Sequence, residues 1–142
     1  IRSALGISQL KNIRKFNLNR KNSFNYYNKN LKNIPGLLIP KSNSKFLSSN
    51  HLYIIRITKT FGMTRDELFE ILLKNGIQTS VHYKPLSKFQ VCKKKAKKYD
   101  SLKNSENLYD EIISLPFYTH ISKNQLDIVI KTIKKIYHQR VN

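Results

Sequence analysis

The chain has 142 residues, 39% of them hydrophobic, which suffices for one domain with a modest core. Its 27 Lys and Arg against eight Asp and Glu give a formal charge of +19, a balance that often marks nucleic-acid binding. Because 21 of these cations are lysines scattered over every predicted helix, we attribute the charge to a general bias of the sequence toward lysine and expect no nucleic-acid partner. A free-standing basic module that binds nucleic acid or another polyanion is the alternative. No stretch approaches the roughly 20 consecutive apolar residues of a membrane span, so we expect no membrane partner. A single cysteine permits no internal disulfide, which agrees with a reducing compartment, and we expect a cytoplasmic protein.

The first half of the chain predicts a long helix followed by a buried strand. Residues 2–31 have helical character, with an apolar stripe that begins at Leu5, and Pro35-Gly36 stops the helix. After a short apolar run and a polar loop, residues 52–57 are β-branched and aromatic. This composition predicts a strand buried on both faces, with Arg56 near its edge.

The middle of the chain predicts a helix and then a strand that carries two rings. Thr64 and Glu67 have the spacing of a capping box, so a helix begins near residue 65, and Gly76 supplies the left-handed residue that ends it. His82 and Tyr83 should then lie on opposite faces of an extended segment that ends at a proline. We call residues 76–86 the lip, because ligands commonly bind where a strand ends.

The last part predicts two helices. One lies near residues 105–112, and the other begins after a second capping box formed by Ser122 and Gln125. The buried face of the final helix should comprise Leu126, Val129, Ile130, Ile133, Ile136 and Tyr137. Two or three short strands with amphipathic helices predict an α+β fold in which helices flank a short antiparallel sheet.

Four sequence blocks in a fixed order carry a resemblance to a known family. They are Ile1 to Leu10, His51-Leu52-Tyr53, the segment from Arg65 through His82-Tyr83-Lys84-Pro85, and Ile113 to Tyr118. Together they span nearly the whole chain. In these blocks the chain resembles the C-terminal part of the DegT/DnrJ/EryC1/StrS family of pyridoxal-phosphate-dependent sugar aminotransferases.

The resemblance implies a fragment of a larger enzyme. It implies that residues 1–142 form the small C-terminal domain of a fold-type I aminotransferase, with the helix at 2–31 leading into it and packing against a large cofactor domain that is absent here. That domain would hold pyridoxal 5'-phosphate on a lysine upstream of Ile1, so this chain alone should be inactive. The complete enzyme would be a homodimer that moves an amino group, typically from glutamate, onto a nucleotide-diphosphate keto sugar. An inactive gene remnant is a further alternative, and some family members dehydrate or regulate instead.

His82 and Tyr83 are the candidate substrate-binding residues. An imidazole can donate at one nitrogen and accept at the other, and a phenol offers a ring to stack and a hydroxyl to bond. The family's His-Tyr-x-Pro block favours this role, whereas a lone histidine at a strand end or a packed tyrosine is commonly structural. The resemblance places the catalytic and cofactor-binding residues upstream of Ile1, so we expect none of them in this chain. We also expect no metal ligand, since the four histidines stand in separate segments.

Overall fold

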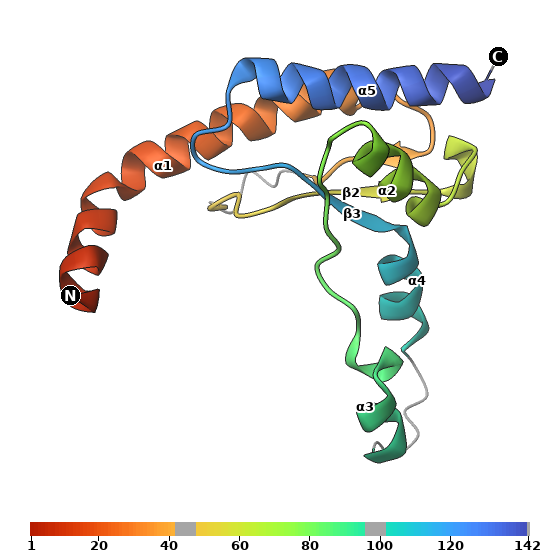
Figure 1. The fold of residues 1–142 in the computed structure, drawn as a ribbon, viewed down its shortest axis with the longest axis horizontal. Coiled ribbons are helices and arrows are strands. Elements are labelled where there is room, and N and C mark those ends of the chain that lie inside the picture. Colours follow the sequence, from red (N-terminus) through yellow and green to blue (C-terminus); the bar gives the residue numbers. More distant parts are fainter. Residues whose placement is uncertain (42–47, 96–101, 142) are drawn as a thin grey trace.

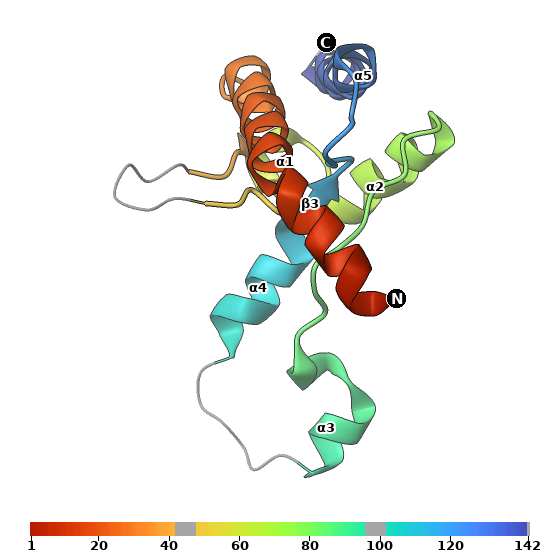
Figure 2. The same cartoon turned by 90° about the vertical axis from the view of Figure 1, so that its left-hand side faces the viewer.

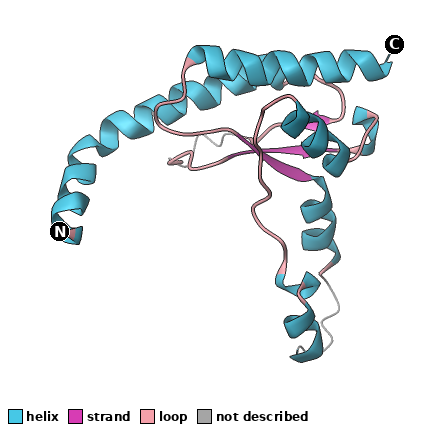
Figure 3. Ribbon diagram, in the orientation of Figure 1, coloured by secondary structure: helices cyan, strands magenta, loops and turns pink. Residues whose placement is uncertain are grey.

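The computed structural model describes residues 1–41, 48–95 and 102–141 (Figures 1 and 3). The α-helices are α1 (Arg2–Leu31), α2 (Arg65–Lys74), α3 (Gln90–Lys95), α4 (Lys103–Glu111) and α5 (Lys123–Val141). The strands are β1 (Leu37–Leu38), β2 (Tyr53–Ile57) and β3 (Ile112–Leu115), and two short 3₁₀ helices are η1 (Lys59–Phe61) and η2 (Leu86–Lys88). The predicted helix at 2–31 is confirmed, residue for residue.

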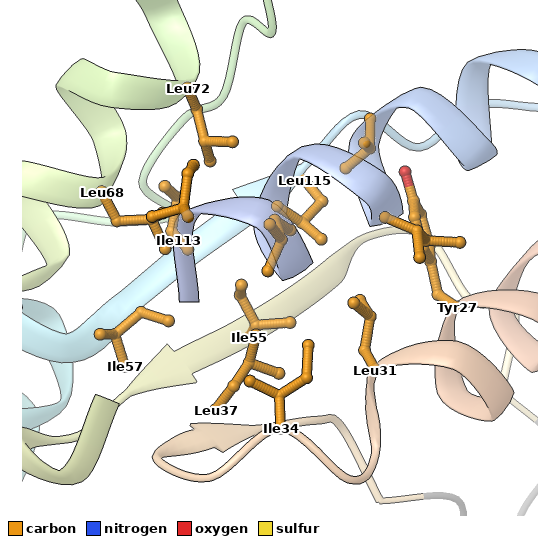
Figure 4. Close-up of a cluster of buried hydrophobic side chains, with 14 of the residues drawn as sticks. Tyr27, Leu31, Ile34, Leu37, Ile55, Ile57, Leu68, Leu72, Ile113 and Leu115 are labelled. Carbon is orange, nitrogen blue, oxygen red and sulfur yellow. The ribbon is translucent and has the colours of Figure 1, made fainter. Parts of the chain in front are cut away.

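One antiparallel sheet of order β1-β2-β3 organises the molecule. Helices α1 and α5 lie side by side over one face of it, and α2 lies beside them (Figure 2). Apolar side chains from all these elements meet in one core, where residues such as Leu31, Ile55 and Ile113 point toward one another (Figure 4). The α3 and α4 region projects away from α1 and α5 (Figures 1 and 2).

Strand β2 is buried on one face only, so the prediction of burial on both faces is wrong. Tyr53, Ile55 and Ile57 are buried, whereas Ile54 is half-buried and the Arg56 side chain is 46% exposed. The Arg56 guanidinium pairs with Glu111 at 2.6 Å. The alternation follows from the two-residue period of a strand, because helices cover a single face of this sheet.

Both predicted capping boxes are present. The Thr64 hydroxyl accepts from the Glu67 amide at 3.2 Å, and the Glu67 carboxylate accepts from the Thr64 amide at 2.7 Å. At the start of α5, Ser122 and Gln125 make the same reciprocal pair. The five predicted aliphatic residues of α5 are all buried, and Tyr137 packs against the core. These helix starts could be predicted because the determining contacts are local.

The apolar stripe of α1 is divided between two environments. In its second half, Tyr27 and Leu31 are buried, and the Tyr27 hydroxyl donates to the Pro116 carbonyl at 3.0 Å. In its first half, Leu5 and Leu10 are 61% and 68% exposed. That half extends beyond the rest of the molecule (Figure 3). Apolar residues therefore recur along the whole helix, interrupted by Asn and Lys, but only those of the second half have a partner among the described residues.

One other predicted element, the helix near residues 105–112, differs from the structure. The helix expected at 105–112 is α4, which ends at Glu111, while Ile112 opens β3 and pairs with Arg56. Leu108 and Ile112 have helical spacing, but pairing with β2 decides the conformation of Ile112. The lysine run at 93–98 begins in α3, which is described to Lys95; the rest lies outside the described residues.

Candidate functional site at the edge of the sheet

The lip is joined to the sheet through one residue pair. Helix α2 ends before Gly76, whose φ of 74° is the left-handed conformation predicted for it. Ser80 then pairs with Ser114 of β3: the Ser114 amide donates to the Ser80 carbonyl at 2.7 Å, and the Ser80 amide donates to the Ser114 carbonyl at 3.2 Å. The strand expected beyond Ser80 is absent from the described lip, because pairing stops there and the chain bends at His82.

His82 folds back against β3. Its Nδ1 lies 2.8 Å from the Ser114 hydroxyl and 3.5 Å from the Ser80 hydroxyl. The imidazole is half-buried and borders an open hollow of about 630 Å³ on the sheet face opposite α1 and α5. Lining residues of this His82 hollow include Ile54, Arg56 and Leu108. His82 therefore lies at a concave surface that combines apolar walls with cationic side chains.

Tyr83 lies beside His82 and not on an opposite strand face. The two rings meet edge to face, with centroids 4.7 Å apart and planes at 82°, and the peptide bond between them is cis. Tyr83 is 75% exposed. Its ring and hydroxyl are consequently accessible to a ligand, whereas the imidazole is fixed by Ser114. The predicted opposite-face arrangement is wrong, because it assumed a strand that continues past Ser80.

The segment after the lip is tied to α4 by polar contacts. Ser87 donates to the Glu106 carboxylate at 2.7 Å, and the Lys88 ammonium lies 2.6 Å from the Asp110 carboxylate. The same ammonium lies 4.7 Å from the centroid of the Tyr109 ring. These contacts join η2 to the helix that runs directly into β3, so both ends of the lip depend on the same strand.

A second hollow lies on the other side of the lip. It measures about 550 Å³ and lies between residues 76–80, the segment after β3 and the first turns of α5. Tyr118 lines it and is 45% exposed. The Thr79 hydroxyl is buried in its wall, with no hydrogen-bond partner among the described residues.

The described residues do not by themselves fit a pyridoxal-phosphate site. An imine-forming lysine works from a pocket that excludes water, yet the buried polar or charged residues are Ser23, Arg65, Thr79 and Ser114. Within residues 1–41, 48–95 and 102–141 no cluster of His, Cys, Asp or Glu could hold a metal ion. No helix in the same residues is long and apolar enough to cross a membrane.

Comparison with known proteins places these features in a family. The DegT/DnrJ/EryC1/StrS aminotransferase family matches residues 1–134. The chain belongs to this family. A UDP-4-amino-4,6-dideoxy-N-acetyl-beta-L-altrosamine transaminase of Campylobacter jejuni is 33% identical over 141 residues, which cover 94% of this chain and 37% of that protein. The match confirms the resemblance carried by the four sequence blocks.

Solved structures agree in fold. PseC of Helicobacter pylori, an aminotransferase involved in the biosynthesis of pseudoaminic acid, superposes with a TM-score of 0.83 and 30% identity over 96% of this chain and 37% of its own. Spr1654 of Streptococcus pneumoniae, solved in a PLP form, gives a TM-score of 0.82 and 26% identity over 97% of this chain and 35% of its own. The predicted fold class, an α+β domain of fold-type I aminotransferases, is confirmed. The chain spans a little over a third of the length of these relatives.

Proposed function

We propose that this chain is the small C-terminal domain of a pyridoxal-phosphate-dependent aminotransferase that transfers an amino group, typically from glutamate, to a nucleotide-linked keto sugar. The observation that carries the proposal is the lip: in a member of an aminotransferase family, His82 lines an open hollow and the exposed Tyr83 packs against the His82 ring. The chain alone does not transaminate, since its described residues do not form a cofactor pocket. When bound to the complete enzyme, the cofactor supplies the electron sink for amine exchange.

The chemistry of the lip suits a sugar nucleotide. The imidazole of His82 can hydrogen-bond a phosphate or hydroxyl oxygen, and the exposed Tyr83 offers a flat ring against which a base or sugar can stack. Arg56 lines the same hollow but is paired with Glu111, so the positive charge that attracts a diphosphate comes from Lys32 and Lys41, which also line it. In this proposal the lip binds and orients substrate, while bond making and breaking occur at groups supplied by the large domain.

Two assembly features complete the proposal. The exposed first half of α1 is the surface that packs against the large cofactor domain, because a series of exposed apolar side chains commonly marks an interaction surface. The complete enzyme is a homodimer, so the lip serves a site that is shared between subunits. By itself, the 142-residue chain should associate through α1 as its concentration rises.

The test uses the product of the complete reading frame, extended upstream of the Ile1 codon. We expect it to contain a lysine that binds the cofactor and to transaminate a nucleotide-linked keto sugar with glutamate. His82→Leu, which removes the donor, and Tyr83→Phe should each raise KM for the sugar nucleotide about tenfold, the value of one lost hydrogen bond to a charged group. His51→Leu, at an exposed histidine outside the lip, is the control and should leave KM unchanged.

Two results would overturn the proposal. One is a complete product that has no cofactor lysine and no transaminase activity. The other is a lip variant whose KM for the sugar nucleotide equals that of the unmodified enzyme, because the lip would then not bind substrate. Loss of cofactor absorbance in a lip variant would also contradict the assigned role, since the lip is placed at the substrate and not at the cofactor.

A further inference from the structure

The Ser114 side chain reaches His82 because of the register of the sheet edge. Ser80 and Ser114 exchange two backbone hydrogen bonds, so their side chains project from the same face of the sheet. Ile113 and Leu115 point into the core on the other face, which leaves Ser114 directed toward the lip. Beyond Ser80 the chain bends at His82, and this bend brings the imidazole back against β3, with Nδ1 2.8 Å from the Ser114 hydroxyl.

The Ser114 hydroxyl has few possible hydrogen-bond partners other than His82. The residue is 3% exposed, so water has little access to it. Among the residues that the structure describes, the one hydrogen bond recorded for this hydroxyl joins it to His82 Nδ1, at 2.8 Å. A buried hydroxyl proton is almost always donated to an acceptor. Donation from Ser114 to Nδ1 requires that this nitrogen carry no proton, which leaves the single proton of the neutral imidazole on Nε2.

We propose that Ser114 is a positioning residue that fixes the ring of His82 and holds its proton on Nε2. The imidazole then presents a hydrogen-bond donor at the end of the ring remote from β3. This part of the inference concerns the free protein and is independent of any ligand. The identity of the acceptor, a phosphate or hydroxyl oxygen of a sugar nucleotide, rests on the function proposed above.

Ser80 is the internal comparison for this role. Its hydroxyl is 3.5 Å from the same Nδ1, at the limit of hydrogen bonding, and the residue is exposed. Its backbone is the partner of Ser114 in the pair that joins the lip to β3. Removing the Ser80 hydroxyl therefore perturbs the same stretch of backbone without removing the short contact to the ring.

The experiment is nitrogen-15 NMR of the histidine side chains in the 142-residue chain. Spectra are recorded at about pH 8.5, two units above the ordinary imidazole pKa, so that the rings are neutral. His82→Gln assigns the signal, and exposed His51 provides a solvent reference within the same sample. We expect His82 to be protonated at Nε2, with its Nδ1 signal displaced from that of His51 toward a hydrogen-bonded acceptor.

The variants separate positioning from a general structural effect. Ser114→Ala should abolish the displacement of the His82 Nδ1 signal, Ser114→Thr should retain it, and Ser80→Ala should leave it unchanged. A backbone amide spectrum of each variant reports its folding. A proton on Nδ1 in the unmodified chain overturns the proposal even if no variant folds. An unaltered displacement in a folded Ser114→Ala variant overturns it as well.

Substrate binding by the complete enzyme distinguishes this proposal from the proposed function. Ser114→Ala should weaken sugar-nucleotide binding several-fold, and Ser80→Ala should not. If the NMR result is as expected but neither variant changes binding of the sugar nucleotide, then Ser114 positions His82 and the substrate role of the lip is wrong.

Discussion

At both edges of the sheet a left-handed glycine precedes the edge segment, but the two segments pair with the sheet to different extents. At one edge, Gly36 has a φ of 75° and leads directly into β1; at the other, Gly76 has a φ of 74° and leads into the lip. The Gly36 carbonyl accepts from both the amide and the hydroxyl of Thr58, at 2.8 and 3.1 Å. At the lip edge the chain pairs with the sheet through Ser80 alone among the described residues.

The two edges differ in how closely the neighbouring backbone approaches them. A side-chain carbon added to Gly36 would lie 2.0 Å from the Phe61 amide nitrogen, whereas one added to Gly76 would meet nothing within 4 Å. The β1 edge is therefore closed by backbone packing. The lip edge keeps unpaired backbone and two aromatic side chains beyond Ser80, and such partly paired edges are where proteins place ligand contacts.

The largest expected effect comes from Gly36→Ala. The added methyl group meets backbone that cannot rotate away, so the variant should lose more than about 4 kcal/mol of the free energy of unfolding and should fold poorly if at all. Gly76→Ala is the matched control, and it should lose only about 1 kcal/mol for its left-handed conformation. Urea unfolding followed by circular dichroism measures both. Equal losses would show that Gly36 is not confined by Phe61.

Ser114→Ala should have the next largest effect on stability. It removes the short bond to His82 while leaving the backbone pair with Ser80 in place, so we expect a loss of about 1 kcal/mol. Ser80→Ala should stay within about 0.5 kcal/mol, because its hydroxyl is exposed. A larger loss in Ser80→Ala than in Ser114→Ala would reverse the assignment of the buried partner.

Thr58→Val is a second test of the β1 edge and should have a smaller effect on stability than Gly36→Ala. The substitution removes the hydroxyl that donates to the Gly36 carbonyl and keeps both the branched shape and the backbone amide that donates to the same oxygen. Because that oxygen retains one donor, the free energy of unfolding should fall by only about 0.5 kcal/mol. Thr58→Ser retains the hydroxyl and serves as the control. No difference between Val and Ser would mean that the hydroxyl contributes nothing at this edge.

The smallest expected effect is a pH dependence at the start of α2, the helix that leads to Gly76. Hydrogen bonds from the Thr64 amide and hydroxyl lower the pKa of Glu67 below its usual value. The charged carboxylate therefore stabilises the folded state at neutral pH, and this contribution is lost as the pH falls through the lowered pKa. The stability difference between the unmodified chain and Glu67→Gln should shrink steadily below about pH 4. A difference that stays constant to acid pH would contradict the capping role of the charge.

Whether a feature could be predicted from the sequence depended on how many residues separate the two partners of the contact that determines it. The capping boxes at Thr64 and Ser122 were predicted because both partners lie three residues apart. Ile112 was assigned to a helix, because its spacing from Leu108 does not reveal that it pairs with Arg56, 56 residues earlier. His82 was singled out by a family block, but its contact with Ser114 joins residues 32 apart and leaves no periodic signal.

The lip is joined to the sheet by a single residue pair, so its detachment from β3 can be measured separately from unfolding of the whole domain. The amide hydrogens of Ser80 and Ser114 are each bonded across that pair, while those of β2 belong to the central strand. Local openings expose amides to deuterium at a lower free energy than global unfolding does. Deuterium exchange at Ser80 and Ser114, compared with that at Ile55, would therefore report how often the lip detaches while the rest of the domain stays folded. A sugar nucleotide that binds the lip should slow exchange at those two amides and leave Ile55 unaffected.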